Sequence, residues 1–262
     1  MSRSKIEWTD KTWNPVTGCT KVSEACQNCF AEVMARRLSG MPASKDKYSQ
    51  RFALTLHPEA LGEPYHWTTS HTVFVCSMGD LFHEDVPMSF QSDVMEVISN
   101  CPHHIFQILT KRPQNMLRFF NVFEVPKNAW LGVTCENAAH YDRIDVLRQI
   151  KDAPVRFISA EPLLGDMSDI DLSGIEWVIA GGEVSPRARR TDPDWFRSLR
   201  DRCTAAGVPF FFKAWGTYGE DGVKRSKNAN GHLLDGLVWR ELPTPQYRPR
   251  YRFPLLPHNP KC

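Results

Sequence analysis

Strand-like and helix-like stretches alternate along this sequence from Cys26 to about Trp215. The strand-like runs are short and rich in β-branched and aromatic residues, at 71–76, 104–110, 129–134, 155–159, 177–180 and 208–213. Helix-like stretches separate most of them, at 89–100, 113–120, 138–150 and 192–206. This alternation predicts an α/β fold with a parallel sheet. Six strands, with a short seventh before Cys19, favour a partial (β/α)6-7 TIM-like barrel. A doubly wound sheet is the alternative, because a sequence does not show whether a sheet closes.

The sequence changes character after Trp215, which divides the chain into three parts. Residues 1–215 are assigned to the partial barrel and carry an N-terminal cysteine motif. Residues 216–243 begin as a glycine-rich, charged loop, and their Asp-Gly pair at 235–236 predicts a small hairpin packed on the barrel. Residues 244–262 contain five prolines and four basic residues. They are predicted to be a proline-rich basic tail, which is a candidate contact for a partner protein.

Composition argues against several other classes of protein. The formal net charge is +2, so overall charge predicts neither nucleic-acid nor membrane binding, and any basic surface must be local. The N-terminus MSRSKIEWTD lacks the apolar core of a secretory signal. No apolar run approaches the roughly 20 residues needed to cross a bilayer. The chain is therefore expected to be cytoplasmic, with no membrane partner and with its cysteines reduced.

Three of the eight cysteines are grouped in a polar stretch near the N-terminus. Six residues separate Cys19 from Cys26, and two separate Cys26 from Cys29. The shorter spacing lets two sulfurs face one centre, and Cys19 can supply a third ligand. A structural zinc site needs four protein ligands, whereas the first histidine in the chain is His57. A four-iron cluster would instead leave one iron open. Zinc with a distant fourth ligand, or three unrelated cysteines, are the alternatives.

The other five cysteines stand singly in the sequence, mostly among apolar residues. Free cysteine often behaves as a small core residue, and that is the role expected for them. They are Cys76, Cys101, Cys135, Cys203 and Cys262.

Polar or charged residues follow each predicted strand. In a βα barrel the carboxyl ends of the strands form the functional face, so these side chains are candidates for one site. The candidates for binding a cofactor are Ser77, Gly79, Asp80, Lys111, Glu136, Gly181 and Gly182. The candidates for catalysis are Glu161, Glu183 and Lys213. Because loops are polar in any case, a solvated loop start is the alternative interpretation for each residue.

The segments WNPVTGC and CQNCFAE resemble a phage-associated family of uncharacterised proteins with a three-cysteine motif, which is similar to the radical S-adenosylmethionine (SAM) superfamily. The resemblance runs from Trp8 to Pro243, through SMGDLFH, ILTKRP, WLGVTCEN, ISAEPLLG, VIAGGE, FFKAWG and LLDGLVWRELP. It implies a radical SAM-type barrel, a 4Fe-4S cluster on Cys19, Cys26 and Cys29, and bound SAM. The usual superfamily motif places its first two cysteines closer together and often has an aromatic residue where this chain has Asn28.

A SAM molecule on the open iron would need several contacts. Asp80 is expected to accept hydrogen bonds from its ammonium group, with the strand-end glutamates as rivals. Its carboxylate needs a cation, for which Lys111, Arg112, Lys213 and Arg187 are candidates. The glycines at 181–182 would let the backbone approach the adenosine closely.

The favoured function is a radical SAM-type enzyme that cleaves SAM to a 5′-deoxyadenosyl radical. Its expected substrate is a nucleotide or nucleic acid, because Arg187, Arg189 and Arg190 suit phosphate oxygens, although a solvated loop is the other interpretation. The alternative is a non-catalytic zinc or iron–sulfur module that binds nucleic acid or a partner protein. A hydrolase with Glu161 or Glu183 as general base is a third hypothesis, which no nucleophile–base pairing in the sequence supports.

Overall fold

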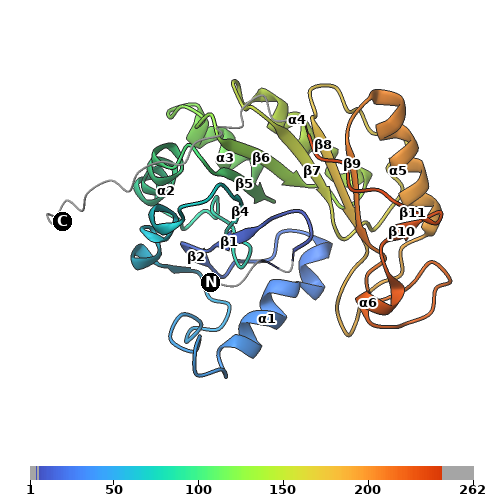
Figure 1. Cartoon of the computed structure of the whole chain (residues 1–262), viewed down its shortest axis with the longest axis horizontal. Helices are drawn as coiled ribbons and strands as arrows, with labels where there is room; N and C mark the ends of the chain where they lie inside the picture. Colours follow the sequence, from blue (N-terminus) through green and yellow to red (C-terminus); the bar gives the residue numbers. More distant parts are fainter. Residues whose placement is uncertain (1–3, 5, 244–262) are drawn as a thin grey trace, which may run out of the picture.

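Seven parallel strands form the central sheet of this protein. The computed structural model describes Ser4 and residues 6–243. The strands are β1 (Lys11–Trp13), β4 (Thr72–Val75), β5 (Ile105–Thr110), β6 (Ala129–Thr134), β7 (Arg156–Ala160), β8 (Trp177–Gly181) and β9 (Phe210–Ala214). They lie in the order β1-β4-β5-β6-β7-β8-β9, and the sheet curls without closing (Figure 1). The partial barrel is confirmed. The doubly wound alternative is wrong, because such a sheet reverses its strand order and this one does not.

Four helices cover the outer face of the sheet. They are α2 (Met88–Asn100), α3 (Pro113–Phe120), α4 (Tyr141–Gln149) and α5 (Pro193–Ala206). In Figure 1 they lie around the outside of the curled sheet, from α2 on the left to α5 on the right. The α5 helix begins where the sequence predicts, because the Asp192 side chain accepts a hydrogen bond from the Asp194 backbone N–H at 3.0 Å. The connection between β7 and β8, at residues 161–176, contains no helix.

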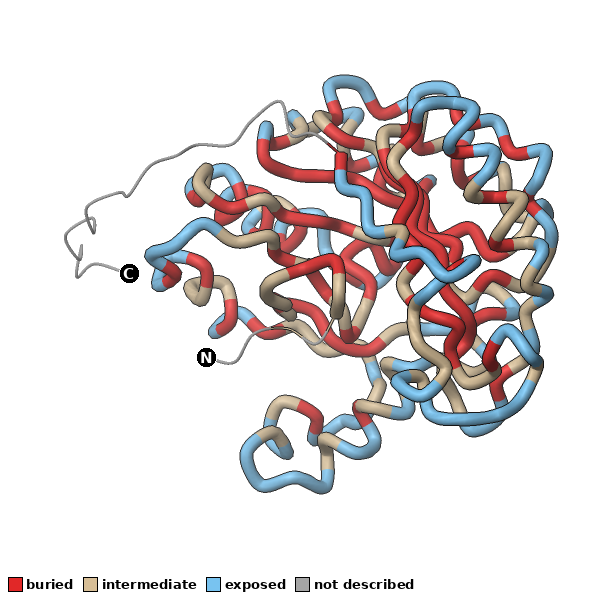
Figure 2. Tube along the Cα trace, turned by 45° about the vertical axis from the view of Figure 1, so that its right-hand side comes forward, coloured by how far each residue is buried: buried red, intermediate tan, exposed pale blue. Residues whose placement is uncertain are grey.

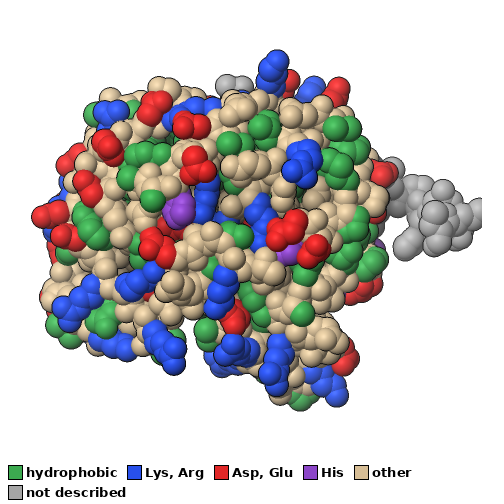
Figure 3. All heavy atoms as spheres, turned by 180° about the vertical axis from the view of Figure 1, so that it is seen from behind, with side chains coloured by type: hydrophobic (Ala, Val, Ile, Leu, Met, Phe, Trp, Pro, Cys, Tyr) green, Lys and Arg blue, Asp and Glu red, His purple; other side chains and the backbone are tan. Residues whose placement is uncertain are grey.

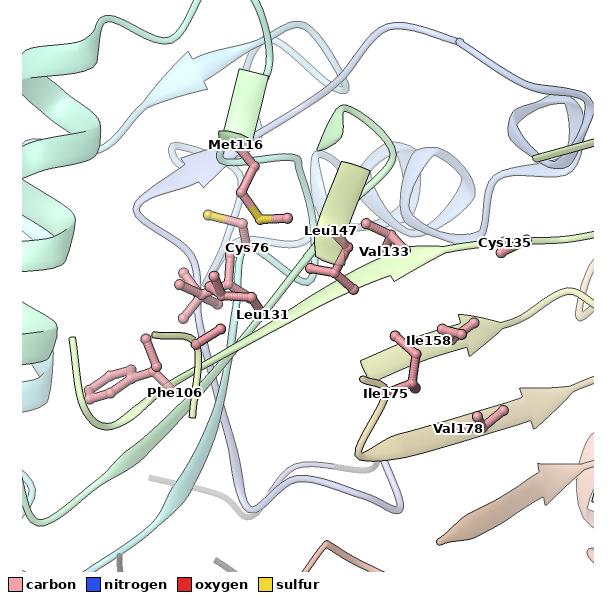
Figure 4. Close-up of a cluster of buried hydrophobic side chains, with 14 of the residues drawn as sticks. Cys76, Phe106, Met116, Leu131, Val133, Cys135, Leu147, Ile158, Ile175 and Val178 are labelled. Carbon is pink, nitrogen blue, oxygen red and sulfur yellow. The ribbon is translucent and has the colours of Figure 1, made fainter. Parts of the chain in front are cut away.

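Alternate residues of each strand pack against these helices. Leu131 and Val133 of β6 lie in one apolar layer with Met116 of α3 and Leu147 of α4 (Figure 4). The four single cysteines in the described residues are buried in the same layer, which confirms their expected role as small core residues. They are Cys76, Cys101, Cys135 and Cys203. Residue 262 lies outside the described residues.

Inward-facing residues of four strands form a largely aromatic layer on the inner face. Trp130, Phe157, Trp177 and Phe211 come from β6, β7, β8 and β9, and all are buried. Trp8, in the segment before β1, packs across them, with its ring centroid 6.1 Å from that of Trp177. Figure 2 shows much of the central sheet as buried, and β6 and β8 are buried at every residue. Because side chains alternate, the next inner positions along the strands lie at their carboxyl ends, beyond the aromatic layer.

Two smaller units are attached to this half-barrel. After β1 the chain forms a two-stranded sheet from β2 (Val16–Thr17) and β3 (Thr55–Leu56). Between these strands lie a 3-10 turn at Glu24–Asn28 and helix α1 (Phe30–Leu38), in the lobe at the lower edge of Figure 1.

The second unit follows β9. It contains the short helix α6 (Lys227–Asn230) and a hairpin of β10 (Leu233–Leu234) and β11 (Leu237–Val238). Asp235 and Gly236, at the turn, have φ values of 54° and 74°, as the primed hairpin turns require. The Trp215 indole donates to the Leu233 carbonyl at 2.8 Å, which holds the hairpin against the barrel. The predicted tail at 244–262 lies outside the described residues. The three-part division of the chain remains our proposal.

Among the described residues, no helix combines the length and the apolar character needed to cross a membrane.

Candidate iron–sulfur site

Cys19, Cys26 and Cys29 line one cavity of about 820 Å³. Its other walls come from α1 and residues 50–53. Within the described ranges, no three His, Cys, Asp or Glu side chains are grouped closely enough to hold a single metal ion. The three sulfurs therefore share a cavity without sharing one ion position. A four-iron cluster binds its thiolates on different irons, which spaces them more widely than one zinc ion does.

Arg112 connects Cys19 to the ends of the neighbouring strands. Its Nη1 donates a hydrogen bond to Cys19 Sγ at 3.2 Å, and its Nη2 donates to Thr20 Oγ1 at 2.6 Å. The guanidinium is buried and is itself held by Glu84 at 2.6 Å and Asp80 at 3.3 Å. Burial opposes its charge, but Cys19 and Asp80 raise the pKa of Arg112 above its usual value. Arg112 thus fixes one side of the cysteine loop.

Asp80 directs its carboxylate toward this arginine and the end of β5. It accepts hydrogen bonds from Thr110 Oγ1 at 2.8 Å, from the Lys111 backbone N–H at 3.2 Å and from the Phe82 backbone N–H at 3.0 Å. Only 5% of the residue is exposed. These hydrogen bonds, with the one from Arg112, occupy the acceptor positions of the Asp80 carboxylate. The geometry therefore favours a role for Asp80 in positioning Arg112, and not the expected role in binding the SAM ammonium group.

Glu136 connects the segment around Cys26 to the end of β6. It is fully buried, and it accepts from Ser23 Oγ at 2.5 Å and from Arg143 Nη1 at 2.7 Å. Ser23 Oγ in turn lies 3.7 Å from Cys26 Sγ. Lys111 Nζ is 3.8 Å from the same carboxylate. The predicted cofactor residues Lys111 and Glu136 are therefore brought together beside the second cysteine.

Glu183 makes the equivalent connection for Cys29 from the end of β8. It accepts from the Nδ2 of Asn28, the residue before Cys29, at 3.2 Å. Arg189 holds the same carboxylate through its Nη2 at 2.5 Å. Asp80, Glu136 and Glu183 thus support the cysteine loop, indirectly or directly. This role is not evident in the sequence, because the partners are far apart in the chain, 155 residues in the case of Asn28 and Glu183.

Glu161 and Lys213 form an ion pair on the inner face of the half-barrel. Their Oε1 and Nζ atoms are 2.5 Å apart, and both side chains are partly exposed. Lys213 follows the aromatic Phe211 by two residues, so it lies one inner position further toward the carboxyl end of β9. A Cβ at Gly181 would lie 3.4 Å from Glu161 and 3.5 Å from Lys213. Two of the three predicted catalytic residues therefore meet, while Glu183 is engaged by the cysteine loop.

The remaining predicted cofactor residues serve chain packing. A Cβ at Gly182 would lie 1.9 Å from the Trp215 carbonyl oxygen, and one at Gly79 would lie 2.9 Å from the Val16 carbonyl oxygen. Ser77 donates to Asn14 Oδ1 at 3.2 Å. The close approach expected at Gly182 is therefore an approach of backbone to backbone.

The first two cysteines of the loop differ in acidity. Burial raises the pKa of Cys19 to about 11. At Cys26 burial also acts to raise the pKa, but a backbone hydrogen bond, the Lys111 ammonium and the Ser23 hydroxyl outweigh it, and the pKa is lowered. Burial raises the pKa of the core thiol Cys135 to about 12. Because metals bind the thiolate, Cys26 is better prepared to be a ligand than the core cysteine.

The solved structures found similar to this chain are of spore photoproduct lyase. One is a mutant of that enzyme, with a TM-score of 0.48, 11% identity, and coverage of 76% of this chain and 62% of the other. Another is a mutant with bound AdoMet and dinucleoside spore photoproduct, with a TM-score of 0.45, 10% identity, and coverage of 73% and 60%. The chain thus spans less than two thirds of the length of either.

No curated protein matches the chain. A family model does match it, over residues 3–243, which include every residue that the structure describes. The chain therefore belongs to the DUF5131 family, which is described as a protein of unknown function.

Proposed function

We propose that this protein is a radical SAM-type iron–sulfur enzyme. The observation that carries the proposal is the position of Cys19, Cys26 and Cys29 on the walls of one cavity, in a loop supported by residues at the carboxyl ends of the parallel strands. Parallel half-barrels place their chemistry at that edge. Cys19, Cys26 and Cys29 would hold a four-iron cluster, which when reduced would supply the electron for cleaving SAM and so for abstracting a hydrogen atom from the substrate.

The donor set of the cavity fits such a cluster. Three thiols line it, and neither a histidine nor a fourth cysteine is among the lining residues in the described part of the chain. Its one lining carboxylate, Glu32, is already paired with Arg36 at 2.6 Å and Lys21 at 3.5 Å. Three thiolates would hold three irons of the cluster and leave the fourth open for SAM.

Two groups are suited to orient SAM and substrate. Lys111 lies beside Cys26 and Glu136 and is partly exposed, so it can bind the SAM carboxylate. The Glu161–Lys213 pair, which lies on the inner face next to Gly181, can bind a polar group of the substrate or hold a proton. A general base at Glu183 is less favoured, because Arg189 and Asn28 both donate to its carboxylate.

The wider biological assignments remain part of this proposal. We retain a nucleotide or nucleic acid as the substrate and a phage association for the protein. Cytoplasmic location and a partner protein bound by residues 244–262 stay predictions. A zinc or iron–sulfur module without catalysis is the alternative function, and it predicts no response to SAM.

The test is the electron paramagnetic resonance spectrum of the reduced, anaerobically reconstituted protein, recorded with and without SAM. We expect the signal of the reduced cluster to change when SAM is added, because SAM binds directly to the open iron. Methionine and S-adenosylhomocysteine serve as comparison ligands. A zinc-containing protein with no iron after reconstitution, or an iron signal that SAM leaves unchanged, would favour the non-catalytic module.

A further inference from the structure

The cavity that the three cysteines line has a basic rim. Apart from Cys19 and Thr20, all residues that line the cavity belong to the segment 21–53. This segment contains six basic and three acidic residues. Arg51 lines the cavity, and Arg37 lies on α1. Both are exposed, and neither has a carboxylate partner among the residues that the structure describes. Cations left unpaired beside a cavity leave a positive potential there.

A second basic segment contacts the cysteine loop at Asn28. The Arg187 carbonyl accepts a hydrogen bond from Asn28 Nδ2 at 3.0 Å, which places this segment directly beside Cys29. The Arg187 side chain is exposed and, in the described ranges, has no carboxylate partner. Arg190 lies over the Tyr218 ring, at 5.2 Å from its centroid. Figure 3 shows Lys and Arg side chains gathered along the lower edge of the molecule, on both sides of a notch.

An exposed aromatic ring begins the helix that carries Arg37. Phe30 directly follows Cys29 and begins α1, and 55% of it is exposed. No other aromatic ring packs on it within the described part of the chain. Exposed aromatic rings between cations are typical of surfaces that bind single-stranded nucleic acids, because any unpaired base can stack on them.

We propose that Arg37, Arg51, Arg187 and Phe30 form a binding surface for a single-stranded nucleic acid at the mouth of the cysteine cavity. The arginines would bind successive phosphates, and Phe30 would stack on an unpaired base beside the cavity. A duplex fits less well, because its bases are already stacked and paired. This inference rests on the proposed function, because it identifies the substrate class of that enzyme. The binding of nucleic acid itself does not require the cluster.

The test is the binding of a fluorescein-labelled single-stranded DNA of mixed sequence, and of its RNA counterpart, to the full chain. The triple variant Arg37→Glu/Arg51→Glu/Arg187→Glu should weaken binding at least about tenfold. Between about 50 and about 200 mM salt, its slope of log affinity against log salt should fall by about 2, because each phosphate contact contributes about 0.7. Phe30→Ala should weaken binding about fivefold or more without changing that slope.

The matched control is Arg118→Glu/Lys127→Glu/Lys151→Glu, which makes the same change in charge at exposed residues away from the rim. It should change the affinity less than about twofold, as expected for charges beyond a Debye length. The proposal would be overturned if the control variant weakened binding as much as the rim variant, or if the protein bound duplex more tightly than single strands. It would also be overturned if heparin bound equally well and Phe30→Ala had no effect. So would the absence of binding to any nucleic acid.

Measuring the iron content of every variant distinguishes a failure of the nucleic-acid surface from a failure of the proposed enzyme function. A rim variant that keeps its iron and its response to SAM but loses the oligonucleotide supports the surface independently. Wild-type protein that binds the oligonucleotide but contains no iron would contradict the enzyme proposal and support the nucleic-acid surface. Wild-type protein with a SAM-responsive cluster and no oligonucleotide binding would support the enzyme proposal and contradict the nucleic-acid surface.

Discussion

Replacing Cys26 by alanine should abolish the visible iron–sulfur absorbance of anaerobically reconstituted protein. The same loss is expected for Cys19→Ala and Cys29→Ala, because each substitution removes one of the three protein ligands of the cluster. Iron and sulfide content per chain, measured beside the absorbance, provide the readout. Wild-type protein should contain about four irons, as a cubane cluster requires.

The control for this prediction is Cys101→Ala. That residue is also a free cysteine, but it is buried in the core between the sheet and its helices, away from the cavity. It should keep its full iron content and lose only a little stability, since alanine is nearly as small and apolar. If Cys101→Ala lost the cluster and Cys26→Ala kept it, the ligand set proposed here would be wrong.

Gly182→Ala should destabilise the fold by about 3 kcal/mol or more, because the added Cβ would overlap backbone that has no rotamer to change. Its position would be 1.9 Å from the Trp215 carbonyl oxygen and 3.3 Å from the backbone nitrogen of Gly216. A loss of this size should lower the melting temperature by about 10 °C for a chain of this length. Urea unfolding of the metal-free protein, followed by circular dichroism, measures the free energy of unfolding directly.

Gly62→Ala is the matched control for that substitution. Gly62 has a φ of −75°, and a Cβ there would have nothing within 4 Å. Alanine should therefore be neutral or slightly stabilising at this position, by at most about 1 kcal/mol, through the unfolded state. A Gly182→Ala protein as stable as wild type would show that the loop after β8 does not lie against residue 215 as described.

The sheet was predictable because each of its features is local in sequence. The strand at 129–134 carries β-branched and aromatic residues and is bounded by turn residues, and the structure places β6 over the same range. Consecutive strands of the sheet are also consecutive in the chain, apart from the β2–β3 insertion. Such order follows from short right-handed connections, which sequence patterns indicate well.

The supports of the cysteine loop were not predictable, because they depend on contacts between distant segments. Glu136 and Ser23 are separated by 113 residues, and Arg112 and Cys19 by 93. The polar ends of the strands pointed to one functional edge, but no periodicity shows which partner each side chain will bind. Asp80 illustrates this, since its position after β4 was consistent with a SAM contact, whereas its hydrogen bonds go to Thr110, Lys111 and Phe82.

The same limit applies to the pair of Glu161 and Lys213. Each follows a predicted strand, so the sequence placed both at the carboxyl edge. Their contact at 2.5 Å depends on the curl of the sheet, which brings the ends of β7 and β9 together across β8. Gly181 lies between them on β8, where a Cβ would make only ordinary van der Waals contact with both side chains.

The most direct measurement of the central claim is the fate of SAM after reduction. Reconstituted protein is incubated anaerobically with SAM and dithionite, and 5′-deoxyadenosine and methionine are quantified by liquid chromatography. The radical SAM proposal predicts both products in equal amounts, dependent on dithionite and absent from the Cys26→Ala variant. A protein that contains a full cluster and yet leaves SAM intact, or that yields S-adenosylhomocysteine instead, would contradict it.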